Sequence, residues 1–264
     1  MYNVFLSGGG MKGAYQYGFF KELYRSYPNF PIKRVYAVSV GAINSVAIVT
    51  KKMSALDEFW CHPERHPFDT IVDDWTDCDD DDVCTTADNR LVSFMRHGSF
   101  FKQMKRAPYE LFLADCKKED LQTLQEKLVI ISYDRVNRTS VFSSCTNTEQ
   151  IIDSIHASSR FPGLFDVKGI EKVDGTFAST DHILLTSSDP WLYIDLQNTL
   201  GVKTTMPTGS MVYSPCISHV PILNEVTCLL SNRVILDYLI KNGKDDARAC
   251  IVQHAKNCIR KTCE

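Results

Sequence analysis

The chain has 264 residues, of which 44% are hydrophobic, and this is typical of one globular domain with a large core, over residues 1–264. Its formal net charge of −3 argues against nucleic acid as a main partner, and no apolar run reaches the roughly 18 residues that a membrane span needs. No charged and then apolar leader precedes the first predicted strand, so we expect a cytoplasmic protein without a signal peptide or transmembrane segment.

A glycine-rich turn follows the first predicted strand, residues 4–6, and leads into a helix predicted over residues 14–24. The turn reads Ser7-Gly8-Gly9-Gly10-Met11-Lys12-Gly13. Unpaired amides at a helix start, together with the helix dipole, favour an anion or a developing oxyanion. Glycines of this kind also suit a nucleotide-binding turn or a tight strand-helix junction. A Walker-type phosphate loop is disfavoured, because Lys12 is followed by Gly13 rather than by serine or threonine.

A second turn of small residues lies at Ser39, between a strand predicted over residues 34–38 and a helix predicted over residues 42–48. Serine at such a bend is the pattern of a nucleophile elbow, which needs small neighbours because strand and helix come close together. Gly41 meets this need, whereas Ala37 stands where glycine is usual. Serine in a tight turn is also a common helix cap, and this alternative stays open from the turn alone.

A third feature is the Asp174-Gly175 pair after the apolar Val173, a sequence that by itself indicates only a turn. Upstream, residues 156–165 read His-Ala-Ser-Ser-Arg-Phe-Pro-Gly-Leu-Phe, which predicts a helix end leading into a Pro-Gly turn with aromatic flanks.

The order and spacing of these features resemble the patatin-like phospholipase family over about residues 3–185. The resemblance implies a three-layer α/β/α fold, with a central, mainly parallel sheet and helices on both faces. It also implies a serine–aspartate dyad acyl hydrolase in which Ser39 is the nucleophile and Asp174 the base. By the same resemblance the oxyanion hole is framed by Gly8, Gly9, Gly10, Met11, Lys12 and Gly13, and the supporting residues are Ala37, Gly41 and Gly175.

Several positions depart from the family pattern. Ser7 stands where many members have aspartate, Ala37 replaces the elbow glycine, and Thr176 follows Asp174-Gly175 where a second glycine is common. The Asn-x-Pro that often comes next is absent from residues 178–181. These departures leave the dyad intact and put the choice of substrate in doubt.

The expected reaction is attack of Ser39 on an ester carbonyl, with Asp174 taking the proton, the glycine amides holding the oxyanion and water releasing the acyl group. An exposed aspartate, with a pKa of about 3.9, is a poor base at neutral pH. We therefore expect Asp174 to be partly buried, because burial raises the pKa of a carboxyl group. No metal or other cofactor is expected.

The substrate expected from the resemblance is a phospholipid or another acyl ester, with peripheral membrane contact. Two other functions stay open: a non-lipid carboxylesterase, and a catalytically silent lipid-binding relative. A Ser-His-Asp triad is the nearest alternative mechanism, with His219 as its candidate histidine. Ser99 and Lys102 also match a Ser-x-x-Lys pattern, which arises easily by chance.

Residues 53–127 are predicted to form an insertion or lid over the site. Within it, residues 73–82 are strongly acidic and favour a solvated loop over a calcium site, because Asp82 stands where a calcium loop needs glycine. Residues 94–106 mix aromatic and basic side chains, which suits either a lid helix or a helix at a membrane surface.

The rest of the chain is predicted to form further strands and helices. Strands are expected over residues 128–133, 140–143 and 191–195, and a helix over 148–157. After a loop over 201–209, a C-terminal helical part from about residue 210 contains helices over 220–240 and 245–259.

The ten cysteines form no Cys-x-x-Cys pair, so reduced thiols are expected. Packing within a helix is favoured over a redox or acylation site for Cys250, Cys258 and Cys263.

Overall fold

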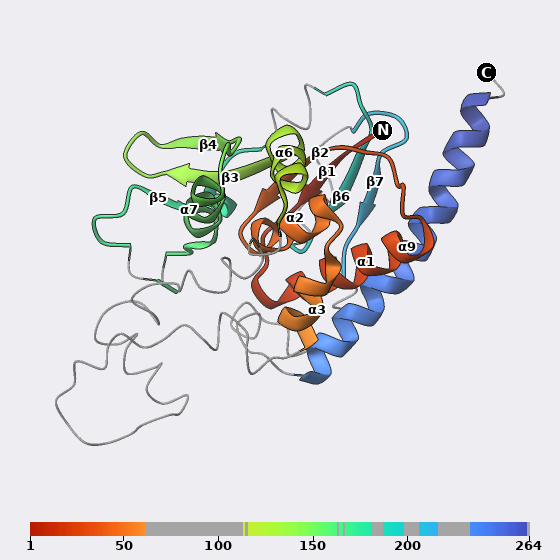
Figure 1. The fold of residues 1–264 in the computed structure, drawn as a ribbon, viewed down its shortest axis with the longest axis horizontal. Coiled ribbons are helices and arrows are strands. Elements are labelled where there is room, and N and C mark those ends of the chain that lie inside the picture. The colour runs from red at the N-terminus through yellow and green to blue at the C-terminus, as the bar shows by residue number, and fades with distance from the viewer. Residues whose placement is uncertain are drawn as a thin grey trace.

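Figure 1 shows the chain as a computed structural model, which describes residues 1–61, 113, 116–162, 164–165, 167–180, 187–197, 206–215 and 233–262. Several predictions lie outside these residues and stay predictions: the acidic segment 73–82, the aromatic and basic segment 94–106, the Ser99 and Lys102 pattern, and His219.

The centre of the fold is a sheet with the strand order β4-β3-β2-β1-β6-β7, in which β5 also pairs with β3 (Figure 1). Four strand pairs are parallel (β1 with β2, β1 with β6, β2 with β3, β6 with β7), and β4 and β5 run antiparallel to β3. The strands are β1 Tyr2–Leu6, β2 Ile32–Val38, β3 Leu128–Asp134, β4 Thr139–Ser143, β5 Lys172–Asp174, β6 Trp191–Ile194 and β7 Met211–Tyr213. The predicted mainly parallel sheet is therefore confirmed.

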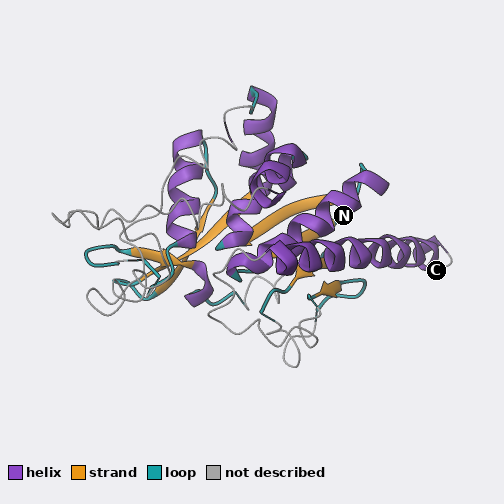
Figure 2. Cartoon of the chain, turned by 90° about the horizontal axis from the view of Figure 1, so that it is seen from below, coloured by secondary structure: helices purple, strands orange, loops and turns teal. Residues whose placement is uncertain are grey.

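Helices lie between most of the strands along the chain. They are η1 Gly10–Lys12, α1 Gly13–Ser26, α2 Val40–Thr50, α3 Met53–Cys61, α6 Lys118–Lys127, α7 Thr148–Ser159, η3 Gly175–Phe177 and α9 Arg233–Thr262. Figure 2 shows them flanking the sheet, which agrees with the expected three-layer α/β/α fold. Within the described residues, no helix is both long and apolar enough to cross a membrane.

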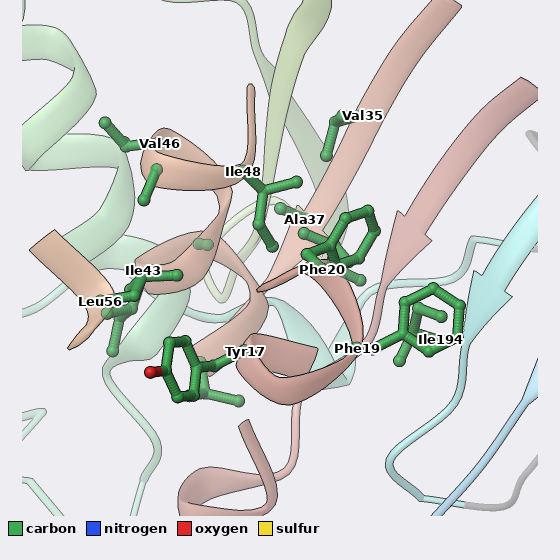
Figure 3. Close-up of a cluster of buried hydrophobic side chains, with 14 of the residues drawn as sticks. Tyr17, Phe19, Phe20, Val35, Ala37, Ile43, Val46, Ile48, Leu56 and Ile194 are labelled. Atoms are coloured by element: carbon green, nitrogen blue, oxygen red, sulfur yellow. The ribbon is translucent and has the colours of Figure 1, made fainter. Parts of the chain in front are cut away.

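Two hydrophobic clusters lie on the two faces of the sheet. In β1, Val4 and Leu6 point into the main core while Phe5 belongs to the smaller cluster, because successive strand residues face opposite sides. Figure 3 shows side chains from α1, α2, α3 and β2 meeting in the main core, among them Phe20, Ile43, Leu56 and Val35. The smaller cluster contains Phe5, Val38, Ile131, Trp191 and Tyr193.

The C-terminal helices were predicted wrongly as two, because residues 233–262 form the single helix α9 (Figure 1). Gly243 lies between the two predicted helices and does not end α9: a Cβ added there would lie 2.2 Å from the Tyr15 carbonyl oxygen of α1, so this glycine permits close packing. A Cβ added to Gly18 of α1 would lie equally close, 2.2 Å, to the Ile240 carbonyl oxygen of α9. The glycines therefore bring two helices into backbone contact without ending either. The short strand β7 was not predicted from the sequence.

Both ends of the predicted insertion belong to the folded core. Leu56 and Trp60 of α3 and Leu124 of α6 are buried in the main cluster. The middle of that segment, residues 62–112, lies outside the described part of the chain, so a lid over the site stays a prediction.

Candidate active site

The turn at Ser39 has the geometry of a nucleophile elbow. Ser39 has φ 55° and ψ −125°, a strained conformation for a residue with a side chain, and it lies between the end of β2 and the start of α2. A Cβ added to Gly41 would lie 2.3 Å from the Leu6 carbonyl oxygen, so the position after the turn requires glycine. Ala37 is fully buried in the main core, and its extra methyl group is accommodated there.

Strand pairing brings Asp174 to the end of β2. Val38 pairs with Ile131 of β3, and Asp174 pairs with the next residue, Ser132. Because β4 occupies the other edge of β3 over residues 130–134, β2 and β5 share one edge and approach it from opposite directions. The carboxyl ends of β2 and β5 therefore meet, and Ser39 comes next to Asp174.

Two serines at the end of α7 hold the elbow in place. The Ser158 hydroxyl donates to the Ile131 carbonyl oxygen at 2.5 Å and accepts from the Ser39 amide at 2.9 Å. The Ser159 hydroxyl donates to the Ser39 carbonyl oxygen at 3.2 Å. The amide and the carbonyl of the strained residue are thus both bonded to side chains of one helix, while the Ser39 side chain stays partly exposed.

Asp174 is completely buried, more fully than the sequence analysis expected. Its Oδ1 accepts from the Thr176 amide at 2.8 Å and from the Thr176 hydroxyl at 2.6 Å, whereas its buried Oδ2 has no hydrogen-bond partner among the described residues. Burial raises the pKa of Asp174 to about 6, an effect that the nearby Ser39 hydroxyl and the two bonds from Thr176 only partly offset. Asp174 is therefore ionised at neutral pH and keeps one free acceptor oxygen.

The glycine turn passes directly beside these residues. A Cβ added to Gly8 would lie 2.9 Å from both the Ser39 Cβ and the Thr176 Oγ1, so only glycine fits between them. Gly10 has φ 55°, which also favours glycine. Among the described residues, the amides of Gly8, Gly9 and Gly10 have no backbone acceptor, so these donors are available at the start of α1.

The predicted residues of the turn contribute in different ways. The Met11 side chain is buried in the main core, so this residue offers the site only its backbone. The Lys12 ammonium donates to the Leu196 carbonyl oxygen at 3.2 Å, which ties the turn to the end of β6. Gly13 packs against α2, where an added Cβ would lie 2.3 Å from a Val40 methyl group. Gly175 is also closely packed, because a Cβ added there would lie 2.1 Å from the Ile131 carbonyl oxygen.

A buried polar network beneath the turn was missed by the sequence analysis. The Gln16 amide donates to the Ser7 carbonyl oxygen at 2.9 Å, and the Asn44 amide donates to Gly13 O at 3.0 Å and to Gln16 Oε1 at 3.1 Å. The Trp60 indole in turn donates to Asn44 Oδ1 at 3.0 Å. The available signal was Gln16 within the mainly apolar residues 13–20 and Asn44 within the mainly apolar residues 40–49. The network joins α1, α2 and α3 to both ends of the glycine turn.

Thr176 was also not placed in the site from the sequence, although its departure from glycine was noted. Neither was Ser7, whose hydroxyl accepts from the Leu196 amide at 2.7 Å and so fixes the start of the turn. Among the described residues, no three His, Cys, Asp or Glu side chains gather closely enough to hold a metal ion.

Comparison with known proteins gives a family match. The sequence model of the family described as patatin-like phospholipase matches residues 4–186. Among solved structures, VipD from Legionella pneumophila is 14% identical with a TM-score of 0.49, and a chain of the ExoU–SpcU complex from the type III secretion system of Pseudomonas aeruginosa is 15% identical with a TM-score of 0.45. Each alignment covers 96% of this chain, but 67% of VipD and 52% of the other chain. No protein with a curated description matches the sequence.

The matched residues extend over more than half of the chain. They include the glycine turn, the elbow at Ser39 and the buried Asp174, the three features whose order first indicated the resemblance. The chain therefore belongs to the patatin-like phospholipase family.

Proposed function

We propose that the protein is a lipid acyl hydrolase of the phospholipase A type, with Ser39 as the nucleophile and Asp174 as the general base. The observation that carries this proposal is the strained, partly exposed Ser39 beside a buried carboxylate whose Oδ2 has no other partner. Membership of a phospholipase family supports lipid esters as the substrate class.

The proposed acylation begins when Ser39 Oγ attacks the ester carbonyl and its proton moves to Asp174 Oδ2. Oδ1 is already occupied by two donors, so Oδ2 is the oxygen that can accept. A pKa of about 6 keeps Asp174 ionised at pH 7 and still suits a base that must later give its proton back. Asp174 then protonates the leaving alcohol, and the acyl group stays on Ser39.

Deacylation repeats these steps with water. Asp174 takes a proton from a water molecule that attacks the acyl-enzyme, and the proton returns to Ser39 as the fatty acid leaves. In both halves of the reaction the amides of Gly8, Gly9 and Gly10 would hold the oxyanion, since they are donors with no backbone acceptor among the described residues.

Contact with a membrane surface is part of the proposal. Phe161 and Phe177 are exposed, and their ring centroids lie 5.3 Å apart. Phe177 belongs to η3, which starts directly after Asp174, while Arg160, the residue before Phe161, accepts a bond from the Asp174 amide through its carbonyl oxygen. An exposed aromatic pair next to the proposed base suits insertion between lipids or contact with an acyl chain.

The test is release of fatty acid from mixed phospholipid vesicles by the wild type and by Ser39→Ala and Asp174→Asn. Both variants should lose at least 100-fold in rate, because each removes a group that acts in the chemical step. Ser45→Ala is the matched control: Ser45 lies in α2, the helix that begins directly after Ser39, and its hydroxyl bonds within that helix to the Ala42 carbonyl oxygen. Circular dichroism should show equal folding of all four proteins.

Three results would count against the proposal. Full activity in Ser39→Ala would exclude Ser39 as the nucleophile. Faster turnover of soluble short-chain esters than of vesicles at every chain length would favour the carboxylesterase alternative. No release by the wild type, with no labelling of Ser39 by a fluorophosphonate, would favour the silent lipid-binding relative.

A further inference from the structure

The two oxygens of Asp174 differ because of a single neighbouring residue. Thr176 donates to Oδ1 twice, from its amide at 2.8 Å and from its hydroxyl at 2.6 Å. Within the described part of the chain, Oδ2 has no hydrogen-bond partner, although the carboxyl group is completely buried. A buried carboxylate is usually held by donors at both oxygens. The asymmetry therefore needs an explanation.

The position of Thr176 relative to the glycine turn supplies a second constraint. Its Oγ1 would lie 2.9 Å from a Cβ added to Gly8, so the hydroxyl lies between the turn and the Asp174 carboxylate. A threonine hydroxyl has one proton to give, and here it goes to Oδ1. The carboxylate cannot rotate about its Cβ–Cγ bond without breaking both bonds from Thr176.

We propose that Thr176 is a positioning residue for the dyad: its hydroxyl fixes the plane of the Asp174 carboxylate so that Oδ2 alone is left to receive the Ser39 proton. This inference rests on the proposed function, since it assigns a role within the Ser39–Asp174 pair. It also explains why threonine can stand at a position where glycine is common in the family. Glycine would keep the amide bond to Oδ1 but would lose the hydroxyl bond.

The same hydroxyl bond has a measurable effect on ionisation. A donor to the charged form of a carboxyl group lowers its pKa, and the Thr176 hydroxyl lowers the pKa of Asp174 against the opposing effect of burial. Removing the hydroxyl should therefore raise the pKa of Asp174. Because the base must be ionised, the acid limb of the kcat/KM profile should move to higher pH.

Three variants separate the hydroxyl from the rest of the side chain. Thr176→Ala removes the hydroxyl, Thr176→Gly also removes the Cβ, and Thr176→Ser keeps the hydroxyl without the methyl group. Valine is unsuitable, because it would place a methyl group against the carboxylate where the hydroxyl now lies at 2.6 Å. Thr176 is exposed, so these changes should leave the melting temperature nearly unchanged.

The first measurement is the pH dependence of kcat/KM on phospholipid vesicles for all four proteins. Thr176→Ala and Thr176→Gly should move the acid limb upward by about half to one pH unit, and Thr176→Ser should keep the wild-type profile. We expect kcat to fall about tenfold in the first two variants, because the acceptor oxygen is no longer held in one orientation.

The second measurement does not depend on activity. The Asp174 side chain is followed by its carboxyl ¹³C signal during a pH titration, and the signal is assigned by its loss in Asp174→Asn. The pKa should rise in Thr176→Ala and stay unchanged in Thr176→Ser. An unchanged pKa and an unchanged acid limb in Thr176→Ala would overturn the positioning role.

Failure of the proposed function gives a different result. If Ser39→Ala keeps full activity, or if the wild type releases no fatty acid, the dyad itself is wrong and the positioning role falls with it. If Ser39→Ala is inactive while Thr176→Ala behaves as the wild type in both measurements, the dyad stands and only the role of Thr176 is overturned.

Discussion

Val38 and Asp174 occupy successive positions along one edge of β3, although they come from distant parts of the sequence. Val38 pairs with Ile131 and Asp174 with Ser132, and the two strands reach this point from opposite directions. The proposed nucleophile at the end of β2 and the proposed base at the end of β5 are therefore positioned by backbone pairing with the same strand. A pair held in this way needs no flexible loop to bring it together.

Asp174→Asn should abolish activity and stabilise the fold above pH 6. Burial raises the pKa of Asp174 from 3.8 to about 6, so between these values the folded state binds more protons than the unfolded state. The free energy of unfolding of the wild type then falls as pH rises through this window, by about 3 kcal/mol. Asparagine has no charge to bury and avoids this loss.

Urea denaturation at pH 4 and pH 8 checks this prediction. The variant should be more stable than the wild type at pH 8, and the difference should shrink towards zero near pH 4. Lower stability of Asp174→Asn at pH 8 would contradict a buried, destabilising charge at this position.

Asn44→Ala should lower both stability and activity. It removes the partner of the Trp60 indole, of the Gly13 carbonyl oxygen and of the Gln16 side chain, all within the core. Buried groups left without partners should lower the free energy of unfolding by about 2–3 kcal/mol. The glycine turn should also lose its fixed position, which lowers kcat more than it raises KM.

The matched control for this variant is Asn242→Ala. Asn242 also lies in a helix, but among the described residues its side chain bonds only to the Tyr238 carbonyl oxygen one turn away. If both variants lose the same stability and activity, the network beneath the glycine turn has no special role.

Phe177→Ser should reduce hydrolysis of vesicles more than hydrolysis of a soluble short-chain ester. Phe177 is 47% exposed and contacts Phe161 beside the proposed base. If the aromatic pair contacts lipid, its loss weakens binding to the surface by about 1–2 kcal/mol and leaves the chemical step unchanged. The measurement compares the rates on both substrates with vesicle binding by co-sedimentation.

Val212→Ser provides the control, because Val212 is 46% exposed but lies on β7, away from the β3 edge of the sheet. An equal effect of the two substitutions on vesicle hydrolysis would show that general surface hydrophobicity, rather than the aromatic pair, decides the rate.

Gly243→Ala should destabilise the packing of α9 on α1. The added methyl group would lie 2.2 Å from the Tyr15 carbonyl oxygen and 2.7 Å from the Phe19 amide nitrogen, so the two helices must separate. We expect the free energy of unfolding to fall by about 2–3 kcal/mol, as for other overpacked core positions.

Gly169→Ala is the comparison for this prediction. Apart from the neighbouring residues in the chain, no described atom lies within 4 Å of a Cβ at position 169, so the cost of Gly169→Ala, about 1 kcal/mol, comes from the positive φ of 73°. In thermal denaturation, the melting temperature of Gly243→Ala should be well below that of Gly169→Ala. The reverse order would mean that α1 and α9 accommodate the added methyl group without loss of stability.

The helices and strands near the candidate site were largely predictable, because their signals are local. The apolar run at residues 4–6, the glycine turn and the small residues around Ser39 each describe a conformation that neighbouring residues impose. The structure confirms the strand-turn-helix order at both turns, with β1 leading to α1 and β2 leading to α2. The division of the C-terminal part into helices over 220–240 and 245–259 was wrong, because a local pattern does not show that residues 233–262 continue as one helix packed on α1.

The sequence by itself determined the family, the strand-turn-helix order at the two turns and the residues proposed for the dyad, since motif order and local chain geometry are written along the chain. Only the tertiary structure decided that β5 pairs with β3 along the same edge as β2. It also decided that Asp174 is fully buried, with one oxygen that has no partner among the described residues, and that Thr176, Gln16 and Asn44 support the site. These features depend on strand register and on packing between distant segments. Burial and hydrogen-bond partners exist only once those segments meet, and the pKa of Asp174 follows from them.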